Sequence, residues 1–215
     1  MSETPDLDTA FGAAPRPPAE PARKRPKPGE RRVQILQALA AMLEHPGAER
    51  VTTAALAARL EVSEAALYRH FASKAQMFEG LIEFIESSVF TLVNQVVERE
   101  PSGAAQARKI AAVLLQFGEK NPGMTRVMVG DALVFEHERL GARMNQFFDR
   151  LEAQLRQCLR AAAEASGSAT PTVDAQALAS AVVCFVIGRL QRYARSGFRR
   201  SPLDHLDAAL ARLTA

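Results

Sequence analysis

The chain has 215 residues, 47% of them hydrophobic, which is enough to bury a core in one domain or in a small head on a larger body. Its formal net charge is +3, and its two cysteines lack the number and spacing of a disulfide framework or a metal site, so Cys158 and Cys184 are expected to be small buried side chains. The acidic N-terminus excludes a secretory signal and the longest apolar run, 177–188, is shorter than the ~20 residues of a membrane span, which predicts a cytoplasmic protein.

Residues 1–28 are predicted to be a disordered, Pro-rich arm with a basic end. They hold seven of the twelve prolines and almost no large apolar side chains. Such a segment cannot bury enough surface to offset the entropy of ordering it.

A first helix is predicted over 30–44. One apolar stripe runs along it at helical spacing, and His45-Pro46-Gly47 ends it. The stripe consists of Val33, Leu36, Leu39, Ala40 and Leu43.

The stretch TTAALAARLEVSEAALYRHFASKAQMF, residues 52–78, places two short helices and the start of a third within 27 residues. Apolar pairs four residues apart, at 56 and 60 and at 67 and 71, lie on one face of each short helix. Glu61, Val62 and Ser63 interrupt that period, and Ser63 can cap the second short helix. This layout predicts a helix-turn-helix, although an ordinary helical hairpin with solvated charges has similar spacing.

Positive charge is concentrated around this segment. Residues 23–74 hold ten Lys or Arg against five Glu, whereas the remainder of the chain sums to −2. A basic run alone is typical of a solvated tail, but beside a helix-turn-helix it indicates contact with a phosphate backbone.

The rest of the chain predicts helices only. Ser73 and Gln76 form a capping box that opens a helix to about Arg99, and Asn121-Pro122 predicts a break in which Asn121 caps the following helix. The further helices are expected at about 104–120, 122–130, 136–165, 173–195 and 203–213. The fold class is therefore all-α.

The two long C-terminal helices carry apolar stripes with small residues at Ala181 and Gly188. They can pack within one subunit or across a two-fold axis, and a helix-turn-helix protein favours the second, because paired heads read paired half-sites. The stripes are Leu151, Leu155, Cys158 and Leu159 in the first helix, and Leu178, Val182, Phe185 and Val186 in the second.

Several runs resemble the TetR family of bacterial regulators, and within it the nucleoid occlusion factors. They are LYRHFASKAQMF, VSEAALYRHF followed by LIEFIE, and RMNQFFDRLEAQLRQ. The resemblance implies a TetR-like fold: a three-helix, helix-turn-helix DNA-binding head over 29–75 and a helical dimerisation and partner-binding body over 76–215.

The DNA-binding face is expected between Thr52 and Lys74. Thr52 or Thr53 would cap the second helix and meet a phosphate, and the resemblance places Tyr68, His70 and Lys74 against the DNA backbone. For Tyr68 and His70 the competing interpretation is partial burial beside Phe71. The other candidates, for thymine methyls, base edges or phosphates, are Ala65, Ala66, Ser63, Glu64 and Arg69.

Glu61 departs from the family pattern. Regulators of this kind usually have Gly there, which tolerates a left-handed turn, and Glu costs roughly 1 kcal/mol if that dihedral is kept. The turn is therefore expected to differ slightly.

The resemblance also implies a protein partner, the tubulin-like division protein FtsZ, whose C-terminal tail would dock on the fourth and fifth helices. The positions that correspond are Phe84, Val113, Lys120 and Asn121. Lys120 replaces an Arg, so bidentate pairing with an acidic tail is lost there. Leu92 and Gln116 stand where relatives have a basic residue and a Gly, and periodicity alone favours the core for Phe84 and Val113.

The resemblance implies a homodimeric, nucleoid-associated inhibitor of cell division that binds palindromic duplex DNA and, when DNA-bound, blocks FtsZ assembly over the chromosome. The alternative is a ligand-responsive transcriptional repressor, with His137, Glu136 and Arg143 as the polar lining of a pocket. An enzyme is not expected, because the sequence has no phosphate loop, nucleophile elbow or paired metal ligands. No cofactor, metal or catalytic residue is predicted.

Overall fold

The computed structural model describes residues 29–45 and 51–214, and every regular element in these ranges is helical. The predicted disordered arm, 1–28, lies outside the described residues, as do Pro46 and Gly47. The elements are α1 Glu30–Leu43, α2 Thr53–Arg59, α3 Glu64–Tyr68, α4 Lys74–Arg99, α5 Gly103–Lys120, α6 Pro122–Met128, the short 3-10 helix η1 Asp131–Leu133, α7 Glu138–Ala165, α8 Pro171–Arg195 and α9 Leu206–Leu213.

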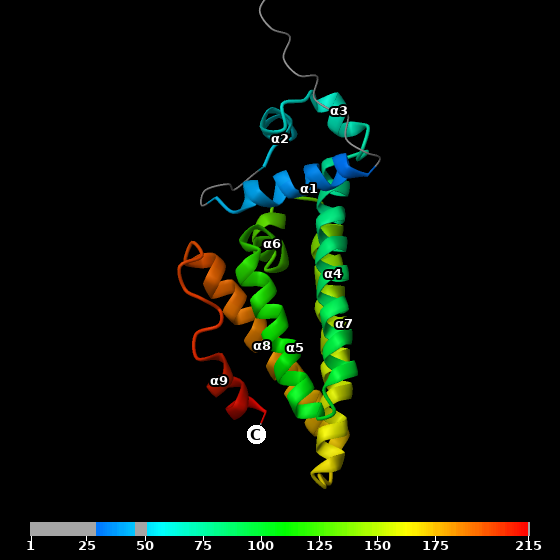
Figure 1. Cartoon of the computed structure of the whole chain (residues 1–215), viewed down its shortest axis with the longest axis vertical. Coiled ribbons are helices and arrows are strands. Elements are labelled where there is room, and N and C mark those ends of the chain that lie inside the picture. The colour runs from blue at the N-terminus through cyan, green and yellow to red at the C-terminus, as the bar shows by residue number, and fades with distance from the viewer. Residues whose placement is uncertain (1–28, 46–50, 215) are drawn as a thin grey trace, which may run out of the picture.

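The molecule has a small head, α1–α3, at one end of an elongated body, α4–α9 (Figure 1). Helix α4 leaves the head and runs down the body, with α7 alongside it. Helix α8 packs along α7, and the C-terminal α9 lies on the flank of the body away from the head. One continuous α4 therefore connects the head with the body.

Side-chain caps fix four helix starts, of which those at Thr52, Ser63 and Ser73 were predicted and that at Ser102 was not. The hydroxyl oxygens of Thr52, Ser63, Ser73 and Ser102 each accept a hydrogen bond from the amide three residues later, at 3.1–3.4 Å. Each bond satisfies an amide that the helix itself leaves unpaired.

The expectation that Asn121 caps α6 with its side chain is wrong. Its Nδ2 instead donates 2.7 Å back to the carbonyl of Phe117, so it closes the end of α5. Pro122 does occupy the first turn of α6, as predicted.

The buried face of α1 differs from the predicted stripe at one position. Val33 is 53% exposed, whereas Ile35 is fully buried together with Leu39, Ala40 and Leu43. Helix α1 packs against α2, α4 and α6, and this arrangement places Ile35 inward. Leu36 is partly buried.

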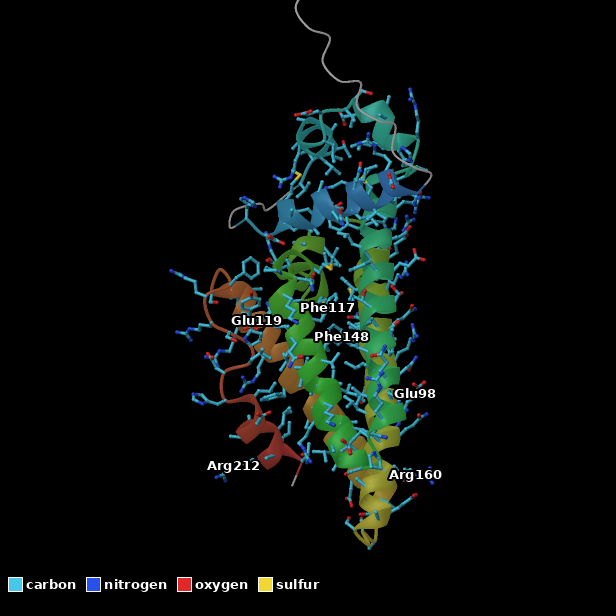
Figure 2. All side chains as sticks on the ribbon, viewed as in Figure 1. Glu98, Phe117, Glu119, Phe148, Arg160 and Arg212 are labelled. Atoms are coloured by element: carbon cyan, nitrogen blue, oxygen red, sulfur yellow. The ribbon has the colours of Figure 1, made fainter. Side chains whose placement is uncertain are left out.

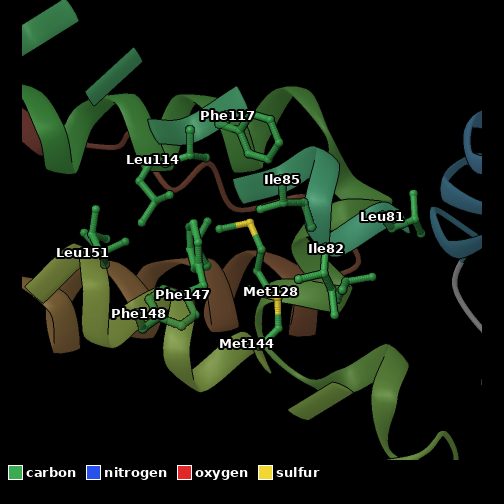
Figure 3. Packing of buried hydrophobic residues seen from close by; sticks show 14 of the residues in the cluster. Leu81, Ile82, Ile85, Leu114, Phe117, Met128, Met144, Phe147, Phe148 and Leu151 are labelled. Carbon is green, nitrogen blue, oxygen red and sulfur yellow. The ribbon is translucent and has the colours of Figure 1, made fainter. Parts of the chain in front are cut away.

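The body core lies between α4, α5, α6, α7 and α8, and Figure 3 shows part of it. Each fully buried aliphatic or aromatic side chain contributes about 1.5–3 kcal/mol relative to exposure. Figure 2 shows Phe117 and Phe148 inside the bundle, and Glu98 and Arg160 on its outer surface. The core residues labelled in Figure 3 are Leu81, Ile82, Ile85, Leu114, Phe117, Met128, Met144, Phe147, Phe148 and Leu151.

The head rests on the body through a backbone contact. A Cβ atom on Gly123, at the start of α6, would lie 2.0 Å from the carbonyl oxygen of Ala40 in α1. Only glycine allows the two backbones to come this close. Arg126 adds a hydrogen bond of 3.4 Å to the carbonyl of Leu43.

The two cysteines differ in exposure. Cys158 is buried, and burial raises the pKa of its thiol. The expectation that Cys184 is also buried is wrong, because it lies on an outward face of α8.

Within the described residues, α4 and α8 are long and apolar enough to cross a membrane by length and composition alone. A core helix of a bundle meets the same criteria, and only a third of the most apolar window of each is buried within the single chain. The apolar part of α8 is therefore longer than the uninterrupted run 177–188 on which the sequence-based expectation rested.

Candidate nucleic-acid interface

The α2–α3 turn keeps the left-handed dihedral usual for this motif. Glu61 has φ 54°, a region that L side chains rarely adopt, so the expected deviation of the turn is not seen. The amide of Val62 donates 3.0 Å to the carbonyl of Ala57, and the Val62 side chain packs against the core between the two helices.

Thr52 and Thr53 have different roles. Thr52 caps α2, whereas the hydroxyl of Thr53 donates 2.6 Å to the carboxylate of Glu64 at the start of α3. This bond links the first turns of both helices of the motif. Both side chains are thus engaged within the motif.

Helix α3 presents one face to solvent. Leu67 and Phe71 are buried to 1% exposure, while Tyr68 is 45% exposed. The competing interpretation was that Tyr68 is partly buried beside Phe71. That holds for about half of the Tyr68 side chain, and the remainder is open to solvent. The other exposed candidates on this side are Ser63, Glu64, Ala65, Arg69 and His70, and Ala66 is partly buried.

Arg32 fastens α1 to the end of α3, a contact that the sequence pattern did not indicate. Its Nη1 donates 2.6 Å to the carbonyl of His70, and its guanidinium lies 4.1 Å from the centroid of the Phe71 ring. Arginine offers both a planar cation and several donors, which suits this double contact. Arg32, in the first turn of α1, thus links that helix to the motif.

Lys74, the first residue of α4, forms an ion pair with Glu136, which follows η1. The exposed fraction is 21% for the Lys74 side chain and 9% for that of Glu136. No local pattern indicated this pairing, because the partners are 62 residues apart.

The four partner-binding candidates lie on α4, on α5 and at the α5–α6 junction. Phe84 is 48% exposed, so the periodicity argument that favoured the core is wrong for it, while Val113 is partly buried. Lys120 is exposed, and the amide of Asn121 is held by Phe117. Of the two departures from the family pattern, Leu92 is 40% exposed and Gln116 is exposed.

The polar groups considered for a ligand pocket are already engaged in structural contacts. His137 accepts a hydrogen bond of 3.3 Å from the amide of Arg139 at the start of α7. Arg143 donates 2.8 Å to Glu86, which raises the pKa of the guanidinium, and Glu136 is paired with Lys74. These three side chains therefore do not converge on a ligand.

Family comparisons define the class of protein. Residues 35–81 match the model described as "Bacterial regulatory proteins, tetR family", and 103–214 match a SlmA-like "Tetracyclin repressor-like, C-terminal domain". The regulator FadR from Bacillus halodurans has the same fold, with a TM-score of 0.71 at 12% identity over 87% of this chain and 96% of that one. AibR, solved with isovaleryl coenzyme A and operator DNA, gives a TM-score of 0.68 at 16% identity, covering 86% of this chain and 98% of that one.

Curated relatives narrow the class to one family. The nucleoid occlusion factor SlmA of Photobacterium profundum is 50% identical over 182 residues, which span 84% of this chain and 92% of that protein. SlmA of Escherichia coli O9:H4 is also 50% identical, over 87% of this chain and 94% of its own length. The chain belongs to the SlmA family of nucleoid occlusion factors, within the TetR family of regulators.

Proposed function

We propose that this protein is a sequence-specific DNA-binding nucleoid occlusion factor, which inhibits FtsZ assembly when it is DNA-bound and so blocks division over the chromosome. The observation that carries the proposal is 50% identity to nucleoid occlusion factors along more than nine-tenths of their length. The exposed face of α3, within the segment 23–74 that holds ten Lys or Arg against five Glu, supports the DNA-binding part.

The DNA interface is proposed to centre on the start and outer face of α3. Ala65 and Ala66 are small enough to approach thymine methyls, while Ser63, Glu64 and Arg69 lie within reach of base edges or phosphates. The backbone contacts are assigned to the α2 start at Thr52 and Thr53, and to Tyr68, His70 and Lys74.

A homodimer is proposed to pair two heads on a palindromic site. Helix α8 buries Val182 and Val186 in its own body, but Cys184 and Gly188 face outward. An apolar helix with an open face of small residues is suited to close packing against its two-fold copy. The dimer would set the spacing between the two α3 helices.

The FtsZ-binding surface is proposed on the solvent-exposed sides of α4 and α5. Phe84 is an exposed aromatic side chain, which at an interface serves as an anchor. Lys120 supplies a single positive charge for an acidic tail, and Leu92 replaces a charge with apolar surface. The proposal therefore predicts a contact that depends more on apolar burial than on ion pairing.

Pelleting of FtsZ polymers tests the proposal directly. Polymer mass would be measured with the protein alone, with the protein plus its specific duplex, and with the protein plus an unrelated duplex at physiological ionic strength. A DNA-dependent nucleoid occlusion factor should reduce the pellet most with specific DNA. A transcriptional repressor without action on division should leave the pellet unchanged in all three mixtures.

A further inference from the structure

Three ion pairs connect α4 with α7 and with the residue that leads into α7. Lys74 pairs with Glu136, Glu79 with Arg139 at 2.8 Å, and Glu86 with Arg143 at 2.8 Å. The first pair has the opposite polarity to the other two. A shift of α4 along α7 would bring like charges together, so the three pairs fix the register between the helix that leaves the head and the body.

Among the six paired residues, Lys74 is the one nearest the head along the chain. It is the first residue of α4, directly after the Ser73 cap, and it therefore lies where the head joins the body. Its ammonium group also lies 5.7 Å from the centroid of the Phe78 ring. The proposed function assigns this same ammonium group to a DNA phosphate.

The two roles compete for one ammonium group. The side chains of Lys74 and Glu136 are only 21% and 9% exposed, so the pair is sheltered from solvent. If a phosphate takes the ammonium group, the Glu136 carboxylate is left covered and unpaired, which is unfavourable until the segment moves and water reaches it.

We propose that Glu136 is a positioning residue that holds Lys74 in the free protein, and that a DNA phosphate displaces it on binding. The inference rests on the proposed function and extends it to regulation. Displacement removes the pair nearest the head and leaves the pairs of Glu79 and Glu86, which flank Phe84 on α4. DNA binding and the partner surface are thereby coupled through one helix and its register against α7.

The chain contains a charge-matched control for the test. Glu138 lies two residues after Glu136 and is exposed, and no hydrogen bond or ion pair of its side chain occurs in the described part of the chain. Glu136→Gln and Glu138→Gln change the net charge equally, at positions two residues apart in the chain. Only the first substitution releases Lys74.

DNA affinity would be measured by fluorescence anisotropy for the full-length wild type and both variants, with thermal unfolding to confirm folding. Glu136→Gln should bind the specific duplex roughly threefold to tenfold more tightly than Glu138→Gln, because no internal pair has to be broken. In a Lys74→Ala background the Glu136→Gln substitution should bring no gain. Equal affinity of the two glutamine variants, or weaker binding by Glu136→Gln, would overturn the proposal.

FtsZ pelleting without DNA gives a second readout. Glu136→Gln should reduce the pellet in the absence of DNA by a measurable fraction of the wild type's DNA-dependent effect, and Glu138→Gln should not. If the wild type acts on FtsZ only with DNA and both glutamine variants need DNA to the same extent, the coupling is contradicted. A wild type that ignores both DNA and FtsZ would instead refute the proposed function.

Discussion

Thr53 and Glu64, both candidates for DNA contact, are hydrogen-bonded to each other, with the Thr53 hydroxyl 2.6 Å from the Glu64 carboxylate. The bond joins the first turn of α2 to the first turn of α3 and so holds the angle of the helix-turn-helix. It also orients Glu64 before any DNA arrives. Thr53 is therefore expected to act mainly by positioning α3.

Thr53→Val should lower the free energy of unfolding by about 1 kcal/mol, because Val keeps the shape of Thr but leaves Glu64 without its donor. The measurement is urea unfolding followed by circular dichroism. Thr53→Ser retains the hydroxyl and serves as the control. Equal stability of the Val and Ser variants would show that the bond contributes nothing.

Tyr68→Ala is expected to weaken DNA binding about tenfold for all duplex sequences and to leave its dependence on salt concentration unchanged, because the neutral phenol releases no counterion. A backbone contact carries no sequence information, so specific and unrelated duplexes should lose affinity alike. Val33→Ala removes another exposed apolar side chain from the head and should have no effect. Unchanged affinity of Tyr68→Ala would remove this residue from the interface.

Phe84→Asp should abolish the action on FtsZ and spare DNA binding. The side chain is 48% exposed, so an aspartate there remains solvated and the fold should tolerate it. FtsZ pelleting and DNA anisotropy are the two measurements. Val173→Asp, at a position that is 67% exposed on α8, controls for added charge. A folded Phe84→Asp protein that still acts on FtsZ would remove Phe84 from the partner surface.

Gly188→Arg should produce a folded monomer. A Cβ atom at Gly188 meets nothing within 4 Å in the single chain, so the substitution is tolerated within α8 but introduces bulk and charge on its open face. Sedimentation velocity would distinguish monomer from dimer, and Gly188→Ala should remain dimeric. Dimers of the Arg variant would place the two-fold interface elsewhere.

Gly123→Ala should destabilise the protein by about 1–3 kcal/mol, because its Cβ would lie 2.0 Å from the carbonyl oxygen of Ala40 and would push α1 away from α6. Gly141→Ala, also within a helix but with nothing within 4 Å, is the control. Thermal unfolding of both variants is the measurement. Equal melting temperatures would show that α1 shifts at no cost.

Local sequence signals predicted most helix starts, because a cap requires only the hydroxyl and an amide three residues away. Ser63 and Ser73 are examples, and α4 ends at Arg99 as expected. The same reasoning failed for Asn121, because its side-chain amide can donate as well as accept. Its Nδ2 donates 2.7 Å to the carbonyl of Phe117 at the end of α5, and its oxygen does not cap α6.

Periodicity was less reliable for exposure. It placed Val33 in the core and favoured the core for Phe84. An apolar stripe identifies one face of a helix, but it does not tell how much of that face the neighbouring elements cover. Cys184 was misplaced for another reason, because its burial was inferred from its residue type and not from a place on the apolar stripe. Only the packing of α1 on α6, and of α8 on α7, determines which edge of each apolar face remains open.

Short-range patterns along the chain were sufficient to predict an all-helical protein, a helix-turn-helix beside a basic segment, and the family resemblance. The pairings of Lys74 with Glu136, Arg32 with His70 and Thr53 with Glu64 came from the tertiary structure alone. The physical reason is range: a cap or an apolar period acts within one or two helical turns, whereas a cross-link between distant segments depends on the path of the whole backbone.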